Sequence, residues 1–82
     1  MVKVVFAEHF KRIASKIKDM TVREQLGKLI YKIVGSPEIG KPMRNIRKGT
    51  REIYSGSFRI SYLYDQKTET LYLLDIYHKD KQ

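Results

Sequence analysis

The chain has 82 residues, enough for one small domain, and its 17 lysines and arginines against nine acidic residues give a net charge of +8. Such a charge favours an anionic partner: nucleic acid, an acidic protein or a membrane surface. The lack of cysteine excludes a disulfide framework, a thiolate nucleophile and a cysteine-ligated zinc site. The first apolar run is too short for a signal peptide, and no stretch of about 20 apolar residues could span a bilayer. We therefore expect a cytoplasmic location.

The first half of the chain predicts one strand and two helices. Residues 2–6 alternate weakly and are rich in β-branched residues, as in a strand. Apolar residues at three- and four-residue spacing then predict the buried side of a helix: Phe10, Ile13, Ala14, Ile17 and Met20. Thr21 and Glu24 have the spacing of a capping box, so a second helix is expected to begin there and to end at Gly35. We expect these helices to form an antiparallel pair.

Beyond Gly49 the period changes to two. Residues 50–54 and 58–64 predict a hairpin with a short glycine-containing loop, and residues 71–77 predict a last strand after a turn. The order β-α-α-β-β-β indicates an α+β fold, with an antiparallel sheet and a helical hairpin packed on one face. A single domain is expected over residues 1–82.

Side chains alternate across a strand, so each predicted strand has a core face and a polar face. One consistent arrangement packs these side chains against the helices: Ile53, Ile60, Tyr62, Leu74 and Ile76. The opposite face then carries Thr50, Glu52, Arg59, Ser61, Asp75, Tyr77 and, by extension, Lys79. An arginine beside carboxylates on such a face is either a structural cross-strand ion pair or part of an anion site, and the pattern leaves both open.

A basic segment leads into the hairpin, with no carboxylate before Glu52. Its five cations are Lys41, Arg44, Arg47, Lys48 and Arg51. They could be solvated surface, but the lack of interleaved acids favours electrostatic contact with RNA phosphates. Such contacts carry little sequence information and depend strongly on salt.

The whole chain resembles the RelE/ParE superfamily of toxins from type II toxin–antitoxin modules, and it is closer to the RelE-like branch. The resemblance rests on TVREQL in the second helix, GKP in the loop, the hairpin GTREIYSGSFRISYLY and the ending LYLLDIYHKDKQ. It implies the RelE-like fold and a ribosome-dependent endoribonuclease that cleaves mRNA without a metal or other cofactor. It also implies a cognate antitoxin. The alternatives are a ParE-like inhibitor of DNA gyrase and a non-catalytic relative that binds RNA and its antitoxin.

The resemblance also implies roles for individual residues. Arg59 occupies the place of the arginine that stabilises the phosphate. His78 resembles the general acid of some members, with Tyr77 beside it and placed to stack on a base, and Lys79 matches a basic residue found there in others.

Cleavage of RNA without a metal also needs a base for the ribose 2′-OH, in addition to cations for the phosphate and an acid for the leaving oxygen. Members with the catalytic histidine often place a glutamate base just after the Lys-Pro of the loop, whereas Met43 stands there in this chain. Glu52 is the candidate base, by elimination and because it shares a predicted sheet face with Arg59.

Overall fold

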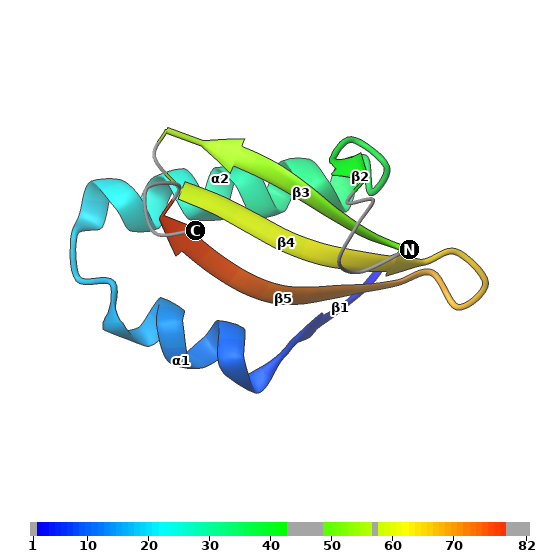
Figure 1. Ribbon diagram of the computed structural model, residues 1–82, viewed down its shortest axis with the longest axis horizontal. Coiled ribbons are helices and arrows are strands. Elements are labelled where there is room, and N and C mark those ends of the chain that lie inside the picture. The colour runs from blue at the N-terminus through cyan, green and yellow to red at the C-terminus, as the bar shows by residue number, and fades with distance from the viewer. Residues whose placement is uncertain (1, 43–48, 57, 79–82) are drawn as a thin grey trace.

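The computed structural model describes residues 2–42, 49–56 and 58–78, and these form two helices and five strands (Figure 1). In chain order the elements are β1 Lys3–Phe6, α1 Glu8–Lys16, α2 Met20–Gly35, β2 Lys41–Pro42, β3 Thr50–Ser55, β4 Phe58–Asp65 and β5 Thr70–His78. No helix in this part of the chain is long and apolar enough to cross a membrane.

The strands form one sheet in the order β1-β5-β4-β3-β2. The predicted α+β fold is confirmed, but the sheet is mixed, because β1 pairs in parallel with β5 while the other neighbours are antiparallel. The two-residue strand β2 was not predicted. The parallel pair joins the first strand to the last, and such a distant pairing leaves no local signal in the sequence.

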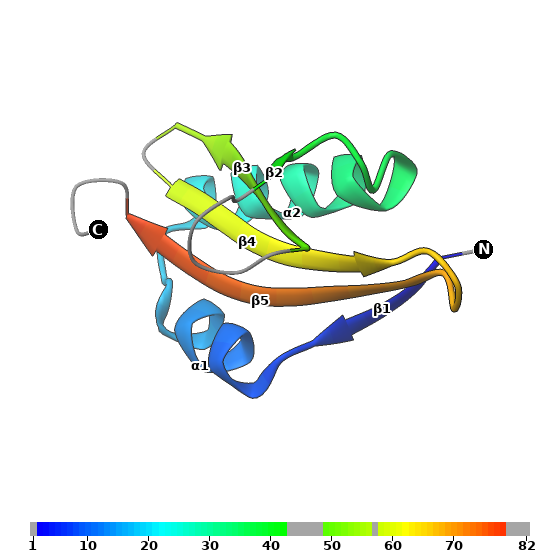
Figure 2. The same cartoon turned by 45° about the vertical axis from the view of Figure 1, so that its right-hand side comes forward.

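The core lies between the sheet and the helices. In Figure 1, α2 lies behind β3 and β4 while α1 runs beside β5, so no described helix covers the face turned to the viewer. Figure 2 shows α1 next to β5 and α2 next to β3. Both helices and strands β4 and β5 supply the buried apolar side chains: Phe10, Leu26, Leu29, Ile33, Ile60, Tyr62, Leu71, Leu73 and Ile76. The uncovered face of the sheet is therefore the one that can carry polar groups.

The second helix begins at Met20, one residue before the predicted capping box. Asp19 is its N-cap, because Oδ1 accepts hydrogen bonds from the amides of Thr21 and Val22 at 2.9 and 3.4 Å. The predicted capping box of Thr21 and Glu24 is wrong, since an upstream carboxylate already satisfies the first amides. Met20, predicted to lie on the buried side of the first helix, is instead 68% exposed.

A β-bulge in β5 decides which of its side chains enter the core. Ser61 pairs with Asp75, but the next residue, Tyr62, pairs with Leu73, so Leu74 is an extra residue on β5. The prediction that Leu74 packs against the helices is wrong, and the fully buried Leu73 lies there instead. Strict alternation misplaced Leu74 because a bulge shifts the faces by one residue.

Tyr62 ties the loop after α2 to the sheet. Its buried hydroxyl donates a hydrogen bond to the carbonyl oxygen of Pro37 at 2.9 Å and accepts one from the amide of Gly40 at 2.8 Å. A Cβ on residue 40 would lie 2.5 Å from that hydroxyl, so the close approach requires glycine. Burial raises the pKa of Tyr62, although the hydrogen bond from Gly40 lowers it in part.

We expect Tyr62→Phe to lower the free energy of unfolding by about 1–3 kcal/mol, because the Gly40 amide and the Pro37 carbonyl lose their partner. Thermal denaturation should show a fall in Tm of at least about 4 °C, the size expected for 1 kcal/mol in a small domain. Tyr31→Phe is the matched control, since Tyr31 is 82% exposed and the change should leave Tm almost unaltered. Equal Tm values for the two variants would contradict the role assigned to the Tyr62 hydroxyl.

Candidate functional site

Two rows of side chains from β3, β4 and β5 lie next to each other on the uncovered face of the sheet. Residues directly opposite each other in antiparallel strands project to the same face, so the register defines the rows. The row nearer the β3–β4 hairpin consists of Tyr54, Arg59 and Tyr77. The next row consists of Glu52, Ser61 and Asp75. The structure therefore places three predicted site residues, Glu52, Arg59 and Tyr77, on one face.

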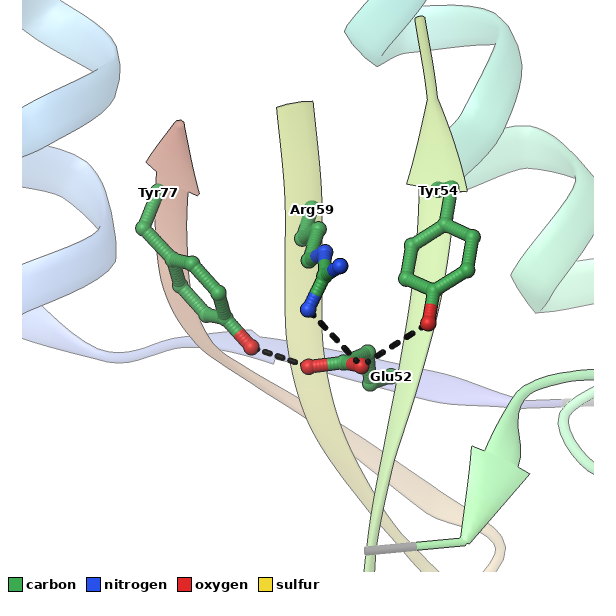
Figure 3. A network of polar contacts seen from close by, with 4 residues as sticks. All are labelled: Glu52, Tyr54, Arg59 and Tyr77. Atoms are coloured by element: carbon green, nitrogen blue, oxygen red, sulfur yellow. Dashed lines mark hydrogen bonds and ion pairs between the residues drawn. The ribbon is translucent and has the colours of Figure 1, made fainter. Parts of the chain in front are cut away.

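Glu52 is the centre of a polar cluster with Tyr54, Arg59 and Tyr77, called here the Glu52 cluster (Figure 3). Its Oε1 accepts a hydrogen bond from the Tyr54 hydroxyl at 3.2 Å and lies 3.5 Å from Nη1 of Arg59. Its Oε2 accepts a hydrogen bond from the Tyr77 hydroxyl. Only 13% of the Glu52 side chain and 23% of the Arg59 side chain are exposed. Three donors thus converge on one sheltered carboxylate.

Arg59 commits little of its hydrogen-bonding capacity to this cluster. Its guanidinium lies over the ring of Tyr54, with Cζ 4.6 Å from the ring centroid, which is a cation–π contact. It meets Glu52 through one nitrogen at 3.5 Å, not through the two-point fork of a strong arginine–carboxylate pair. Its buried Nε has no hydrogen-bond partner in the described part of the chain. Most of its five N–H groups are therefore not committed to Glu52.

The surroundings of Tyr77 keep its hydroxyl protonated. Burial, then the hydrogen bond to Glu52 and the charge of Glu52, raise the pKa of Tyr77 to about 12, while the charge of Arg59 lowers it to a lesser extent. At neutral pH, Tyr77 is therefore a hydrogen-bond donor and not a base. Within the cluster, the acidic group that can accept a proton is the Glu52 carboxylate.

The predicted RNA-binding residues lie in different places. Lys41 is exposed on β2 and is opposite Glu52 in the register, so it extends the Glu52 row. Arg51 instead donates from Nη1 to the backbone carbonyl oxygens of Glu38 and Gly40, at 3.1 and 2.8 Å, and so holds the loop before β2. The remaining predicted basic site residues lie outside the described residues; they are Arg44, Arg47, Lys48 and Lys79.

His78 lies on the opposite face of the sheet from the Glu52 cluster. It is paired with Phe58 in the register, and the two rings meet edge to face with their centroids 5.3 Å apart. Phe58 packs against the hydrophobic core, so this is the helix side of the sheet. Because neighbouring residues of a strand point to opposite faces, the structure brings Tyr77 into the cluster and leaves His78 out.

Two residues that make contacts on this face, Tyr54 and His9, were not among the predicted site residues. Tyr54 contacts both charged members of the Glu52 cluster, and its position two residues after Glu52 on the same strand face was a signal in the sequence. His9 of α1 places Nε2 3.0 Å from Oδ1 of Asp75, at the end of the Glu52 row. No sequence signal could have found this second contact, because it depends on how α1 packs beside β5.

The Glu52 cluster combines a cation, two phenolic donors and a carboxylate in direct contact. Arg59, Tyr54 and Tyr77 can donate to the oxygens of an anion, while Glu52 can accept a proton. Such a set suits proton transfer next to a bound phosphate. Within residues 2–42, 49–56 and 58–78, no group of three or more His, Asp or Glu side chains could hold a metal ion.

We expect an NMR titration with carbon-13-labelled tyrosine to assign a pKa of about 12 to Tyr77. Glu52→Gln should lower this pKa towards the usual value of about 10, because it removes the carboxylate charge that disfavours the phenolate. Part of the shift should remain, since burial is its largest cause. Tyr31→Phe is the control and should leave the Tyr77 titration unchanged. A Tyr77 pKa that did not respond to Glu52→Gln would contradict the contact between the two residues.

No protein-family model and no curated protein sequence matches this chain, but solved structures do. A chain of the RelBE2 toxin–antitoxin complex of Mycobacterium tuberculosis is 23% identical, with a TM-score of 0.83 over 94% of this chain and 96% of that one. A chain of the intact Escherichia coli RelBE toxin–antitoxin complex is 24% identical, with a TM-score of 0.79 over 93% and 94% of the two chains. The isolated E. coli RelE toxin is 21% identical, with a TM-score of 0.81 over 95% and 84%. This chain therefore has the fold of the RelE toxins, as its sequence resemblance predicts.

Proposed function

We propose that this chain is the toxin of a toxin–antitoxin module and that it is a ribosome-dependent endoribonuclease that cleaves mRNA. The fold of the RelE toxins and the net charge of +8 support this proposal. The observation that carries it is the position of Arg59: its guanidinium lies on the uncovered sheet face, in contact with a carboxylate and close to a phenol that stays protonated.

In the proposed reaction, the ribose 2′-oxygen attacks the adjacent phosphorus and the bond from phosphorus to the 5′ oxygen breaks. The products are a 2′,3′-cyclic phosphate and a 5′-OH. Arg59 stabilises the negative charge that develops on the phosphate, because a planar guanidinium can contact two oxygens at once. Glu52 accepts the proton of the 2′-OH. Tyr77 donates to the phosphate or stacks on a neighbouring base.

We propose that His78, which follows Tyr77 at the end of β5, donates the proton to the leaving 5′ oxygen. An imidazole suits this step because histidine titrates near neutral pH. In the structure the His78 ring contacts Phe58 on the helix side, so this role requires His78 to turn towards the phosphate when RNA binds. Lys79, the next residue in the sequence, offers a second cation.

The other partners follow from the same proposal. The basic residues proposed to guide the RNA backbone are Lys41, Arg44, Arg47, Lys48 and Arg51, of which Arg51 also holds the loop before β2. The RelBE2 and RelBE structures are toxin–antitoxin complexes, which supports a cognate antitoxin for this chain. An antitoxin that covers the basic surface would block RNA from it. Because the proposed partners, ribosomes and mRNA, are cytoplasmic, we expect the protein to act in the cytoplasm.

The test is to map mRNA ends after brief expression of the protein and of Arg59→Ala. We expect cleavage by the parent and a loss of about 10²- to 10³-fold in the variant, the usual cost of removing one group that stabilises an oxyanion. Arg12→Ala is the matched control, because Arg12 is exposed on α1 and its loss changes the net charge equally. Arg59→Ala leaves the sheltered Glu52 carboxylate without its cation, which could destabilise the fold. Thermal denaturation is therefore used to check that the variant is folded.

Two other outcomes would count against the proposal. Intact mRNA together with loss of DNA supercoiling would indicate a gyrase inhibitor of the ParE kind. Intact mRNA and normal supercoiling, with the protein retained on RNA, would indicate a non-catalytic relative. Cleavage by Arg59→Ala at the parental rate would show that the site assignment is wrong.

A further inference from the structure

We infer that Glu52 occupies the phosphate site of the resting protein, so that RNA can bind at Arg59 only by displacing the Glu52 carboxylate. The inference rests on the proposed function for the identity of the ligand, a phosphodiester of single-stranded RNA. Displacement has a second consequence: the carboxylate that leaves Arg59 is the one that then accepts the 2′-OH proton. Glu52 is thus both the resting occupant of the site and its base.

The contacts of Glu52 are those that a phosphate would make. Its two oxygens accept from the Arg59 guanidinium and from the hydroxyls of Tyr54 and Tyr77 (Figure 3). A phosphodiester likewise presents two oxygens that share one negative charge, and these oxygens accept hydrogen bonds from arginine and from hydroxyl groups. Tyr77 can serve a phosphate in this way, because its pKa of about 12 keeps it protonated. The donors around Glu52 therefore form a cradle for an oxyanion.

The charge of Glu52 opposes RNA at this point of a basic protein. Glu52 neutralises Arg59, and its side chain is only 13% exposed, so an incoming phosphate meets a sheltered carboxylate next to the cation it needs. Two like charges at contact distance in a partly buried site repel strongly. RNA binding at Arg59 and the Glu52 contact therefore oppose each other.

The contact is built in a way that allows it to open. Arg59 meets Glu52 through a single nitrogen at 3.5 Å, the long end of hydrogen-bond distances. The ring of Tyr54 lies beneath the guanidinium and does not depend on Glu52, so it can hold Arg59 in place after the carboxylate moves. Opening therefore requires a change of the Glu52 side chain and not of the sheet.

Three roles for Glu52 predict three different binding results for Glu52→Gln. If Glu52 were only a base, the variant would bind uncleavable RNA as the parent does. If it only supported the structure of the site, the variant would bind more weakly. If it occupies the phosphate site, the variant should bind more tightly while it cleaves more slowly.

The experiment measures the binding of a labelled 2′-O-methyl oligoribonucleotide by fluorescence anisotropy at several salt concentrations. The methyl group removes the nucleophile, so binding is separated from cleavage. We expect Glu52→Gln to bind at least about tenfold more tightly than the parent, the factor that corresponds to one hydrogen bond between charged groups. The slope of log Kd against log salt concentration should stay nearly the same, because the parent contacts the same phosphates once its Glu52 carboxylate has been displaced.

Glu24→Gln is the matched control for net charge, because Glu24 is exposed on α2. It should change Kd by no more than about twofold, since exposed charges are screened by salt. Glu52→Asp is a second variant that keeps the net charge and shortens the reach of the carboxylate towards Arg59. We expect it too to bind more tightly than the parent, and thermal denaturation should show that each variant is folded.

Binding by Glu52→Gln and Glu52→Asp that is no tighter than by Glu24→Gln would overturn the inference, and so would no binding at all. The proposed function is tested separately by the mRNA ends. Tighter binding by both Glu52 variants, with no cleavage by the parent, would support the occupant role of Glu52 and refute the nuclease. Cleavage by the parent, with unchanged binding by the variants, would support the nuclease and refute the occupant role.

Discussion

The pairing of β4 with β5, with Leu74 as an extra residue in β5, decides which side chains of β5 enter the core and which join the polar face. On one side of the bulge, Leu73 enters the core opposite Tyr62. On the other side, Asp75 lies opposite Ser61 and Tyr77 lies opposite Arg59, on the uncovered face. A strict alternation along β5 would put Leu73 and Tyr77 on the same face, because they are four residues apart. The bulge allows both halves of β5 to supply core side chains, Leu73 before it and Ile76 after it, while Asp75 and Tyr77 lie on the uncovered face.

The charges on the uncovered face differ from those of the molecule as a whole. The chain carries +8, yet the centre of this face is a carboxylate that accepts from two phenols and contacts one guanidinium. A sheltered charge needs such partners, because water reaches it poorly. Glu52 is paired with one guanidinium and two hydroxyls. If the carboxylate moved away, these same donors could bind another anion.

The loop before β2 is held by side chains of β3 and β4. The buried hydroxyl of Tyr62 bonds to Pro37 and Gly40, and Arg51 of β3 donates to the carbonyl oxygens of Glu38 and Gly40. These contacts bring β2 to the edge of β3, where Lys41 lies opposite Glu52. Arg51 therefore holds the loop that leads to Lys41. Two polar side chains replace the regular hydrogen bonds that this loop lacks.

Local patterns in the sequence were sufficient for most elements. The change from a three- to four-residue period to a period of two separates the helices from the hairpin, and Gly35 ends the second helix as predicted. The face shared by Glu52, Arg59 and Tyr77 was also predictable, because alternation within a strand is set by backbone geometry alone. Where a second local signal competed, the prediction was wrong: Asp19, and not Thr21, caps the second helix.

The sequence by itself therefore determined the elements other than β2, the α+β fold and the polar face, since each follows from the spacing of neighbouring residues. Only the tertiary structure decided that β1 pairs with β5, that Leu74 is a bulge and that His78 contacts Phe58 on the helix side. It alone also showed Tyr54 and Tyr77 donating to the same carboxylate and His9 reaching Asp75. The physical reason is that these contacts join distant segments, whose register depends on how the whole core packs and not on any local period.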